Sequence, residues 1–116
     1  MILIDSKAKY KRYLDYLWGT IVILRADKRC ELCYRASKLE AHHYFTRRMH
    51  GNTRWDIDVG VCLCHGCHQW KSLSHSETMR DLIIKRIGQK EFENLKIRAS
   101  MVGKIDFKMW ELVLMS

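Results

Sequence analysis

Two cysteine pairs constrain this chain more than any other feature of its sequence. One pair is Cys30-Glu31-Leu32-Cys33 and the other is Cys64-His65-Gly66-Cys67, with residues 34–63 between them. Four thiolates in two CxxC pairs supply the ligands of a tetrahedral zinc ion, and each pair turns tightly around the metal. The sequence therefore predicts a structural zinc site that ties together the two ends of the intervening segment and helps a small domain to fold.

The number and distribution of the cysteines argue against a disulfide framework. All five cysteines lie between Cys30 and Cys67, and we read no secretory signal in the first residues of the chain. A disulfide-rich secreted domain is expected to have an even cysteine count and a signal peptide. We therefore expect metal binding in a reducing cytoplasm, with the odd thiol, Cys62, packed in a strand. A thiol redox protein that uses one CxxC pair is a weaker alternative.

The composition is that of one small globular domain. The chain has 116 residues, of which 47% are hydrophobic and 29% charged, which excludes a mainly disordered chain. No apolar run approaches the roughly 20 residues that a helix needs to cross a bilayer, so we expect no membrane association. The formal net charge of +8 favours a polyanionic partner such as nucleic acid, although a lysine-rich solvated surface gives the same balance.

Hydrophobic periodicity predicts an α+β domain in which helices flank the segment that carries the cysteines. The expected helices cover residues 6–26, 76–88, 90–99 and 107–115, and Asp106 caps the last of them. We divide the chain into an N-terminal helical extension (1–28), a zinc-anchored core (29–76) and C-terminal helices packed on that core (77–116). The flanking helices enlarge a hydrophobic core that the middle segment alone would struggle to supply.

The central segment is expected to contain two strands and a helix. Leu39 to Phe45 has the pattern of a short strand. Residues 57–63 alternate between apolar and other side chains, which predicts a strand buried on one face. A helix is expected to begin near the second cysteine pair and to continue through Trp70.

Three histidines in this segment are placed to form a reactive site. His42 and His43 are adjacent on the first expected strand, and His68 directly follows Cys67. Adjacent strand residues point to opposite faces, so the two strand histidines can do different jobs. One can share a metal ion with His68 while the other addresses a substrate. The alternatives are a structural pair that fills a strand end, an additional zinc ligand, and a surface residue at His68.

At these residues the chain resembles the HNH family of nucleases, whose fold is the ββα-metal or treble-clef-like fold. The resemblance covers roughly residues 29–76: a CxxC pair, an Ala-His-His segment, and a strand that leads into Leu-Cys-x-x-Cys-His. The Arg54-Trp55-Asp56-x-Asp58 segment that leads into the second strand, together with the flanking helices, is more similar to the phage NinG recombination nucleases of that superfamily. Those relatives often have asparagine where this chain has His68.

The resemblance implies a metal-dependent DNA endonuclease with a one-metal mechanism. His43 corresponds to the general base, while His42 and His68 correspond to ligands of a catalytic divalent cation (Mg, Mn or Ni). Imidazole ligands suit Mn²⁺ or Ni²⁺ better than Mg²⁺, which prefers oxygen. Arg47, four residues after His43, is the expected phosphate contact in the catalytic site, and the alternative is a solvated basic loop.

The chain departs from the family pattern at one position. The central asparagine of the family should fall five residues before Cys64, where this chain has Val59. Because the family asparagine braces the loop and the base, Asp58, Asp56 or Asn52 would have to replace it, or the bracing would have to come from elsewhere. Val59 therefore favours the alternative function, a non-catalytic zinc-knuckle module that binds DNA or a protein.

Within the nuclease interpretation, the expected partner is DNA, either duplex or branched. No part of the chain is large enough for a separate recognition domain, so we expect no long specific target sequence. An enzyme that cuts DNA junctions makes paired incisions, for which a homodimer is expected. The expected location is the cytoplasm, which would be the host cytoplasm if a phage encodes the chain.

Overall fold

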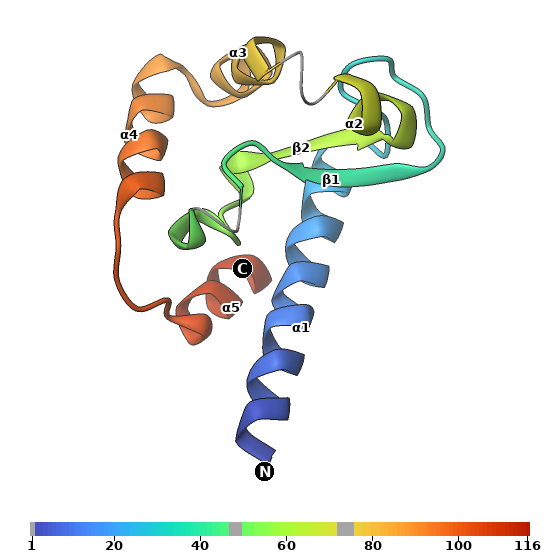
Figure 1. Ribbon diagram of the computed structural model, residues 1–116. Coiled ribbons are helices and arrows are strands. Elements are labelled where there is room, and N and C mark those ends of the chain that lie inside the picture. The colour runs from blue at the N-terminus through green and yellow to red at the C-terminus, as the bar shows by residue number, and fades with distance from the viewer. Residues whose placement is uncertain (1, 47–49, 72–75) are drawn as a thin grey trace.

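The computed structural model describes residues 2–46, 50–71 and 76–116 (Figure 1). Within these residues the chain is a small α+β domain of five α-helices and one two-stranded sheet. The helices are α1 (Ile2–Arg25), α2 (His65–Lys71), α3 (Ser76–Ile87), α4 (Gln89–Ser100) and α5 (Phe107–Met115), and the strands are β1 (Leu39–His43) and β2 (Gly60–Cys64). Two short 3-10 helices, η1 (Gly51–Thr53) and η2 (Ile57–Val59), precede β2.

The strands β1 and β2 form an antiparallel pair that brings the cysteines to one end of the sheet. Leu39 pairs with Cys64 at that end, and His43 pairs with Gly60 at the other end. The helix α2 begins immediately after β2, so the second cysteine pair spans the junction between strand and helix. The His65 N–H donates to the Lys38 carbonyl at 2.8 Å, which holds this junction against the residue before β1.

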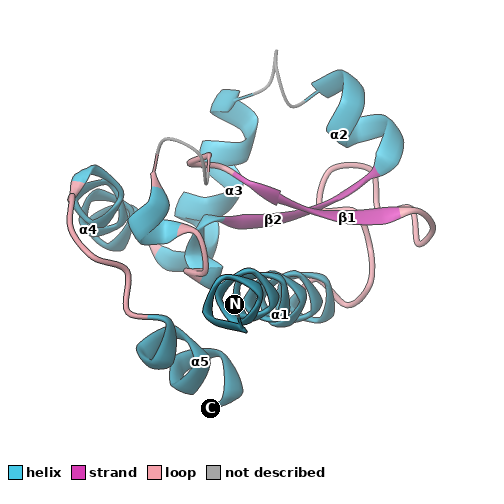
Figure 2. Ribbon diagram, turned by 60° about the horizontal axis from the view of Figure 1, so that its bottom comes forward, coloured by secondary structure: helices cyan, strands magenta, loops and turns pink. Residues whose placement is uncertain are grey.

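The long helix α1 packs along one side of the sheet, and Figure 2 shows α2 on the other side. Leu14, Trp18 and Val22 recur every four residues and are all buried, which is the apolar stripe of a core-facing helix. Gly60 permits this close approach of helix and strand. A Cβ atom at Gly60 would lie 2.4 Å from a Val22 methyl carbon and 3.0 Å from the Trp18 ring.

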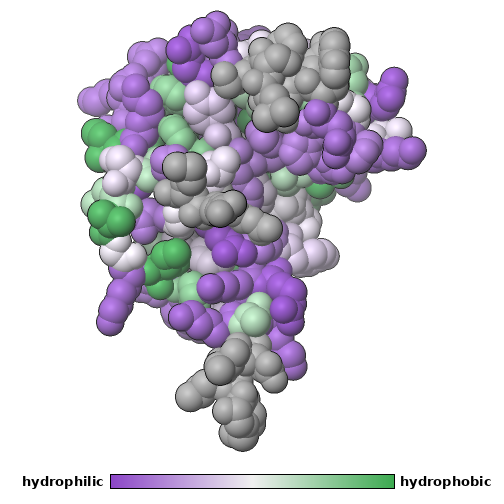
Figure 3. All heavy atoms as spheres, in the orientation of Figure 1, coloured by the Kyte–Doolittle hydropathy of each residue, from purple (hydrophilic) through white to green (hydrophobic). Residues whose placement is uncertain are grey.

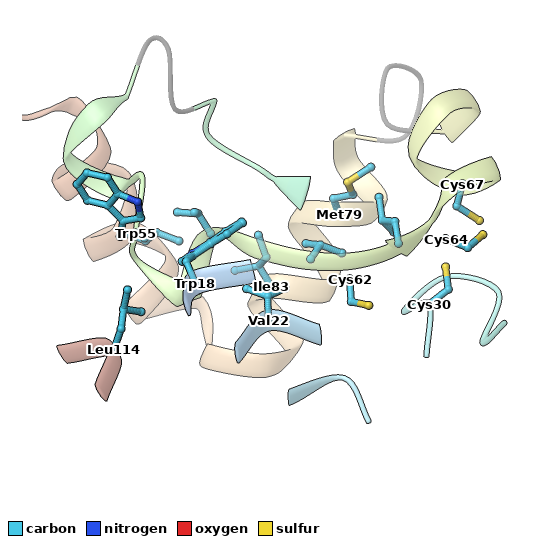
Figure 4. Close-up of a cluster of buried hydrophobic side chains, with 14 of the residues drawn as sticks. Trp18, Val22, Cys30, Trp55, Cys62, Cys64, Cys67, Met79, Ile83 and Leu114 are labelled. Atoms are coloured by element: carbon cyan, nitrogen blue, oxygen red, sulfur yellow. The ribbon is translucent and has the colours of Figure 1, made fainter. Parts of the chain in front are cut away.

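The strand β2 differs from the sequence-based prediction in its start and in its burial. Instead of a strand from Ile57, residues Ile57–Val59 form η2, whose cap is the Asp56 carboxylate accepting from the Asp58 N–H at 3.1 Å. Every residue of Gly60–Cys64 is buried. Met79 and Ile83 of α3 join α1 in the hydrophobic cluster around this strand (Figure 4). Residues between the apolar positions of β2 are therefore small and buried rather than exposed.

The helices expected after the central segment are present as α3, α4 and α5. Asp106 caps α5 as predicted, by accepting from the Met109 N–H at 3.0 Å. Gly88 follows α3 with a φ of 92°, and its N–H donates to the Ile84 carbonyl at 2.7 Å, which ends that helix.

Hydrophilic residues cover much of the face seen in Figure 3. No helix in the described ranges combines the length and the apolar character that crossing a membrane requires.

Candidate functional site

The two cysteine pairs meet in one cluster, as their spacing predicts. The sulfur atoms of Cys30, Cys33, Cys64 and Cys67 all lie within 4.8 Å of one another. Cys33 Sγ and Cys64 Sγ are 3.6 Å apart, and two sulfur ligands about 2.3 Å from a tetrahedral zinc ion lie about 3.8 Å apart. Figure 4 shows the labelled members of the cluster gathered at one end of β2. The cluster therefore has the donor atoms and the spacing of a structural zinc site.

Backbone N–H groups favour ionised sulfur at two of the four cysteines of the cluster, Cys30 and Cys64. Burial alone would raise the pKa of Cys30, but hydrogen bonds from the backbone N–H groups of Cys33, Cys64 and Leu32 outweigh it and lower the pKa to about 7. The Cys67 N–H likewise lowers the pKa of Cys64. Burial and the neighbouring thiols raise the pKa of Cys67 to about 12. A bound cation would favour ionisation of this last thiol as well.

The fifth cysteine, Cys62, is not part of the cluster. Its side chain is fully buried in β2, so the prediction of a packed strand residue is confirmed. Burial and the nearby Glu31 carboxylate raise the pKa of this thiol to about 11. Cys62 is therefore suited to packing, and it lies outside the group of four cysteines that could hold a metal.

The three histidines of the motif border one cavity. This cavity of about 440 Å³ lies along β1, between α1 and α2, and we term it the histidine cavity. Its lining residues are Asp15, Trp18, Gly19, Ala41, His42, His43, Thr46 and His68. The alternation of β1 directs Glu40 and His42 towards α2 and directs Ala41 and His43 towards α1.

His42 and His68 lie at a distance that suits a shared cation. His42 Nδ1 and His68 Nε2 are 3.0 Å apart, and two ligand nitrogens about 2.1 Å from a cation and at right angles to each other are about 3.0 Å apart. His68 Nδ1 donates to the Glu40 carboxylate, so the neutral ring has its lone pair on Nε2, where it accepts from the His42 Nδ1–H; a cation bound between the rings would replace that proton. Burial, followed by the nearby His68 and His43, lowers the pKa of His42 to about 4. His42 is therefore neutral at physiological pH, the form that binds metals.

Glu40 is a site residue that the sequence reasoning missed. The Glu40 carboxylate accepts hydrogen bonds from His68 and from His65 Nδ1, the latter at 2.9 Å. The hydrogen bonds from His65 and then His68 lower the pKa of Glu40. A carboxylate behind a histidine fixes the ring and its tautomer in many metal sites. The available signal was the strand period of two, which places Glu40 on the same face of β1 as His42.

His43 is held from two directions. Its Nε2 lies 2.7 Å from the Arg54 carbonyl oxygen. Because a carbonyl only accepts, Nε2 carries the hydrogen, and the lone pair of the neutral ring is on Nδ1. The ring also stacks on Trp18, with centroids 3.8 Å apart and an interplanar angle of 9°. The Trp18 indole N–H in turn donates to the buried Asp56 carbonyl at 2.9 Å.

Asp15 connects α1 to the loop that contacts His43. Its carboxylate accepts from Arg54 Nε at 3.0 Å and from Arg54 Nη2 at 2.8 Å. It also accepts from the Trp55 indole N–H at 2.9 Å. The sequence reasoning missed Asp15 and treated Trp18 as a core residue, because helical periodicity indicates which residues are buried but not which side chains they touch.

The remaining residues that the sequence suggested for the site are not among the described residues that line the histidine cavity. Arg47 lies outside the described residues. Val59 is fully buried, and its carbonyl accepts from the Tyr44 N–H at 2.8 Å. The suggested replacements for the family asparagine (Asn52, Asp56 and Asp58) are not among the described lining residues of the histidine cavity. Asp56 instead pairs with Arg98 at 2.9 Å.

Comparison of the chain with known protein families, with curated proteins and with solved structures finds no match. The function is therefore inferred from the residues of the site itself.

Proposed function

We propose that this chain is a metal-dependent DNA endonuclease of the HNH type, with a zinc-anchored ββα-metal core. The observation that carries this proposal is the meeting of His42, His43 and His68 at one cavity. The chain order β1, β2, α2 and the antiparallel pairing of the strands support the ββα assignment. The cysteine cluster at the far end of the sheet would anchor β2 and α2 through zinc.

His43 is the general base of the proposed reaction. Its Nδ1 lone pair would accept a proton from the attacking water, a task for which imidazole is the side chain used most often. The hydrogen bond from Nε2 to the Arg54 carbonyl persists after protonation, because Nε2 is a donor in both forms. The ring therefore does not have to reorient during the proton transfer.

His42 and His68 would hold the catalytic cation. When bound, the cation supplies Lewis-acid stabilisation to the scissile phosphate and the leaving oxygen. His42 is neutral because of burial, and the Glu40 carboxylate directs the Nε2 lone pair of His68 towards His42. Two neutral imidazoles favour Mn²⁺ or Ni²⁺ over Mg²⁺.

A row of lysines along a second cavity is suited to the DNA backbone. Lys7, Lys11 and Lys104 border a cavity of about 380 Å³. Lys7 and Lys11 are four residues apart on α1, and Asp15, which lines the histidine cavity, follows four residues after Lys11. Among the described residues, no carboxylate forms an ion pair with these three lysines. Their charge is available to phosphates.

A cleavage assay with a His43→Ala variant tests the proposal. Linear duplex and four-way branched DNA are incubated with each protein in Mg²⁺, Mn²⁺ or Ni²⁺. We expect wild-type cleavage in Mn²⁺ or Ni²⁺ at least equal to that in Mg²⁺, and a loss of about 100-fold or more in His43→Ala. DNA binding by the variant should persist. A His50→Gln variant, altered outside the histidine cavity, is the matched control.

One observation favours a second function. Val59, at the position of the family asparagine, is buried and apolar, so it supplies no polar group to the site. A non-catalytic zinc-knuckle module that binds DNA or a protein would tolerate this residue. Undiminished cleavage by His43→Ala would exclude the assigned base, whereas binding without cleavage by the wild type on every substrate and cation would favour the binding module.

A further inference from the structure

We propose that Asp15 and Trp18 are positioning residues for His43. Both residues lie on α1, outside the segment that carries the cysteine and histidine motifs. This inference rests on the proposed role of His43 as the base. It explains how the base is oriented in a chain whose Val59 has no polar side chain for that purpose.

Trp18 sets the plane of the His43 ring. The near-parallel stack leaves the imidazole little freedom to tilt, and Trp18 is itself only 3% exposed. The hydrogen bond from the Trp18 indole to the Asp56 carbonyl prevents the indole from sliding along the imidazole. The orientation of the imidazole plane is therefore set by a residue from a different element.

Gly60 makes room for this arrangement. Gly60 is the strand partner of His43, and a Cβ atom there would lie 3.0 Å from the Trp18 ring. A side chain at this position would meet Val22 at 2.4 Å and would also crowd the Trp18 ring. The absence of a side chain at Gly60, opposite His43, therefore leaves the space in which Trp18 stacks on the imidazole.

Asp15 sets the direction of the hydrogen-bonding edge of the ring. The Arg54 carbonyl that accepts from His43 belongs to a residue whose guanidinium is held by two hydrogen bonds to Asp15. Asp15 also holds the Trp55 indole, so two consecutive residues of the loop are attached to α1. Fixing this carbonyl keeps Nε2 as the protonated nitrogen and Nδ1 as the acceptor.

The test compares Asp15→Asn and Trp18→Phe with matched controls. Asp27→Asn removes an exposed carboxylate near the end of α1, and Trp110→Phe makes the same aromatic change on α5. Each zinc-loaded full-length protein, labelled with ¹⁵N-histidine and free of other divalent cations, is examined by NMR at pH 8. The ¹⁵N shifts of His43 report its tautomer, a property that a merely structural residue would not change. Steady-state cleavage is measured in parallel.

We expect His43 to be mainly the Nε2–H tautomer in the wild type and in both controls. In Asp15→Asn and Trp18→Phe, the two tautomers should mix, and kcat should fall about 10- to 100-fold with little change in KM. Unchanged His43 shifts in folded Asp15→Asn and Trp18→Phe proteins would overturn the proposal. The NMR result does not depend on cleavage, so an inactive wild type would count against the nuclease function and leave the positioning test decisive.

Discussion

At the scale of the residue, three histidines of the same chemical type have three different environments. His42 is half-buried and neutral, His68 is backed by the Glu40 carboxylate, and His43 is fixed between a carbonyl and an indole. The carboxylate behind His68 and the carbonyl beside His43 each select one tautomer, because such oxygens can only accept a hydrogen bond, whereas burial keeps His42 neutral. Different roles for the three rings follow from their partners rather than from the residue type.

The lowered pKa of His42 predicts a dependence of stability on pH. Its folded-state pKa of about 4 lies below the ordinary value near 6.5. As the pH falls from about 6.5 to about 4, the unfolded chain gains a proton that the folded chain does not, so the free energy of unfolding decreases. The variant His42→Gln lacks this titrating group. After allowance for partial solvent exposure, we expect its free energy of unfolding to fall by about 1–2 kcal/mol less than that of the wild type between pH 7.5 and pH 5.

Denaturant unfolding of the zinc-loaded protein, without a second cation, measures this effect at the two pH values. The difference between His42→Gln and wild type is the relevant quantity, because it cancels the proton dependence of the cysteine cluster. A His50→Gln variant is the control for replacement of a histidine elsewhere. Parallel pH profiles for His42→Gln and wild type would contradict the prediction.

The cysteine cluster predicts one zinc ion per chain with four sulfur ligands. Cys33 is exposed, so Cys33→Ser removes a ligand without leaving a cavity in the core. We expect this variant to lose the absorption spectrum of tetrahedral Co²⁺ bound to sulfur and to lose several kcal/mol of stability. Cys62→Ala, which changes a buried cysteine outside the cluster, should retain the Co²⁺ spectrum. Retention of that spectrum by Cys33→Ser would argue against the four-sulfur site.

At the scale of the element, the short helix α2 depends on its surroundings. A helix of 7 residues is too short to be stable alone. Cys67 and His68, both on α2, would attach it to the cysteine cluster and to the histidine cavity. Zinc would therefore act on the histidine cavity indirectly, by fixing the element that carries His68.

The packing of α1 on β2 predicts opposite effects for two glycines. Gly60→Ala would force the new Cβ against Val22 and Trp18, and we expect a loss of about 1–3 kcal/mol from overpacking. Gly66 lies in α2, and a Cβ atom there would meet no neighbouring atom within 4 Å, so Gly66→Ala should be neutral or gain up to about 1 kcal/mol. Thermal and denaturant unfolding measure both effects. Equal stabilities of the two variants would mean that α1 does not press on β2 at Gly60.

At the scale of the whole molecule, α1 joins several parts of the chain. Its residues contact the sheet, the loop before β2 and α5, where Tyr10 donates to the Glu111 carboxylate at 2.6 Å. The same helix carries Lys7 and Lys11, which border a second cavity together with Lys104. In the proposed function, one helix would therefore support the base and contact the DNA backbone.

The lysine row predicts a specific loss of DNA affinity. Replacing Lys7, Lys11 and Lys104 together with alanine should weaken DNA binding. The plot of log K against log salt should become less steep by about 2 to 3, because each phosphate contact contributes about 0.9 to the magnitude of its slope. The control replaces Lys9, which lies on the opposite face of α1, together with the exposed Lys85 and Lys90. Fluorescence anisotropy over a salt series measures both. An equal loss in the control would assign the effect to net charge alone.

Local sequence patterns determined the features of this protein that depend on neighbouring residues. The CxxC spacing predicted the cysteine cluster, helical periodicity predicted α1, α3, α4 and α5, and Asp106 was recognised as the cap of α5. Each CxxC pair, each helix and the Asp106 cap is encoded within one turn or one element, so these patterns are complete in the sequence. The start of β2 was predicted wrongly, because apolar alternation continues through η2 and does not distinguish it from a strand.

Only the tertiary structure decided which distant side chains meet. Asp15 and Trp18 reach the loop and the base across the space between α1 and β1, and Glu40 reaches His68 across the junction with α2. These contacts depend on helix placement, on the pairing of His43 with Gly60, and on the absence of a Cβ atom at Gly60. A sequence pattern records the burial of a residue, whereas the partner of a buried polar group is set by the packing of elements far apart in the chain.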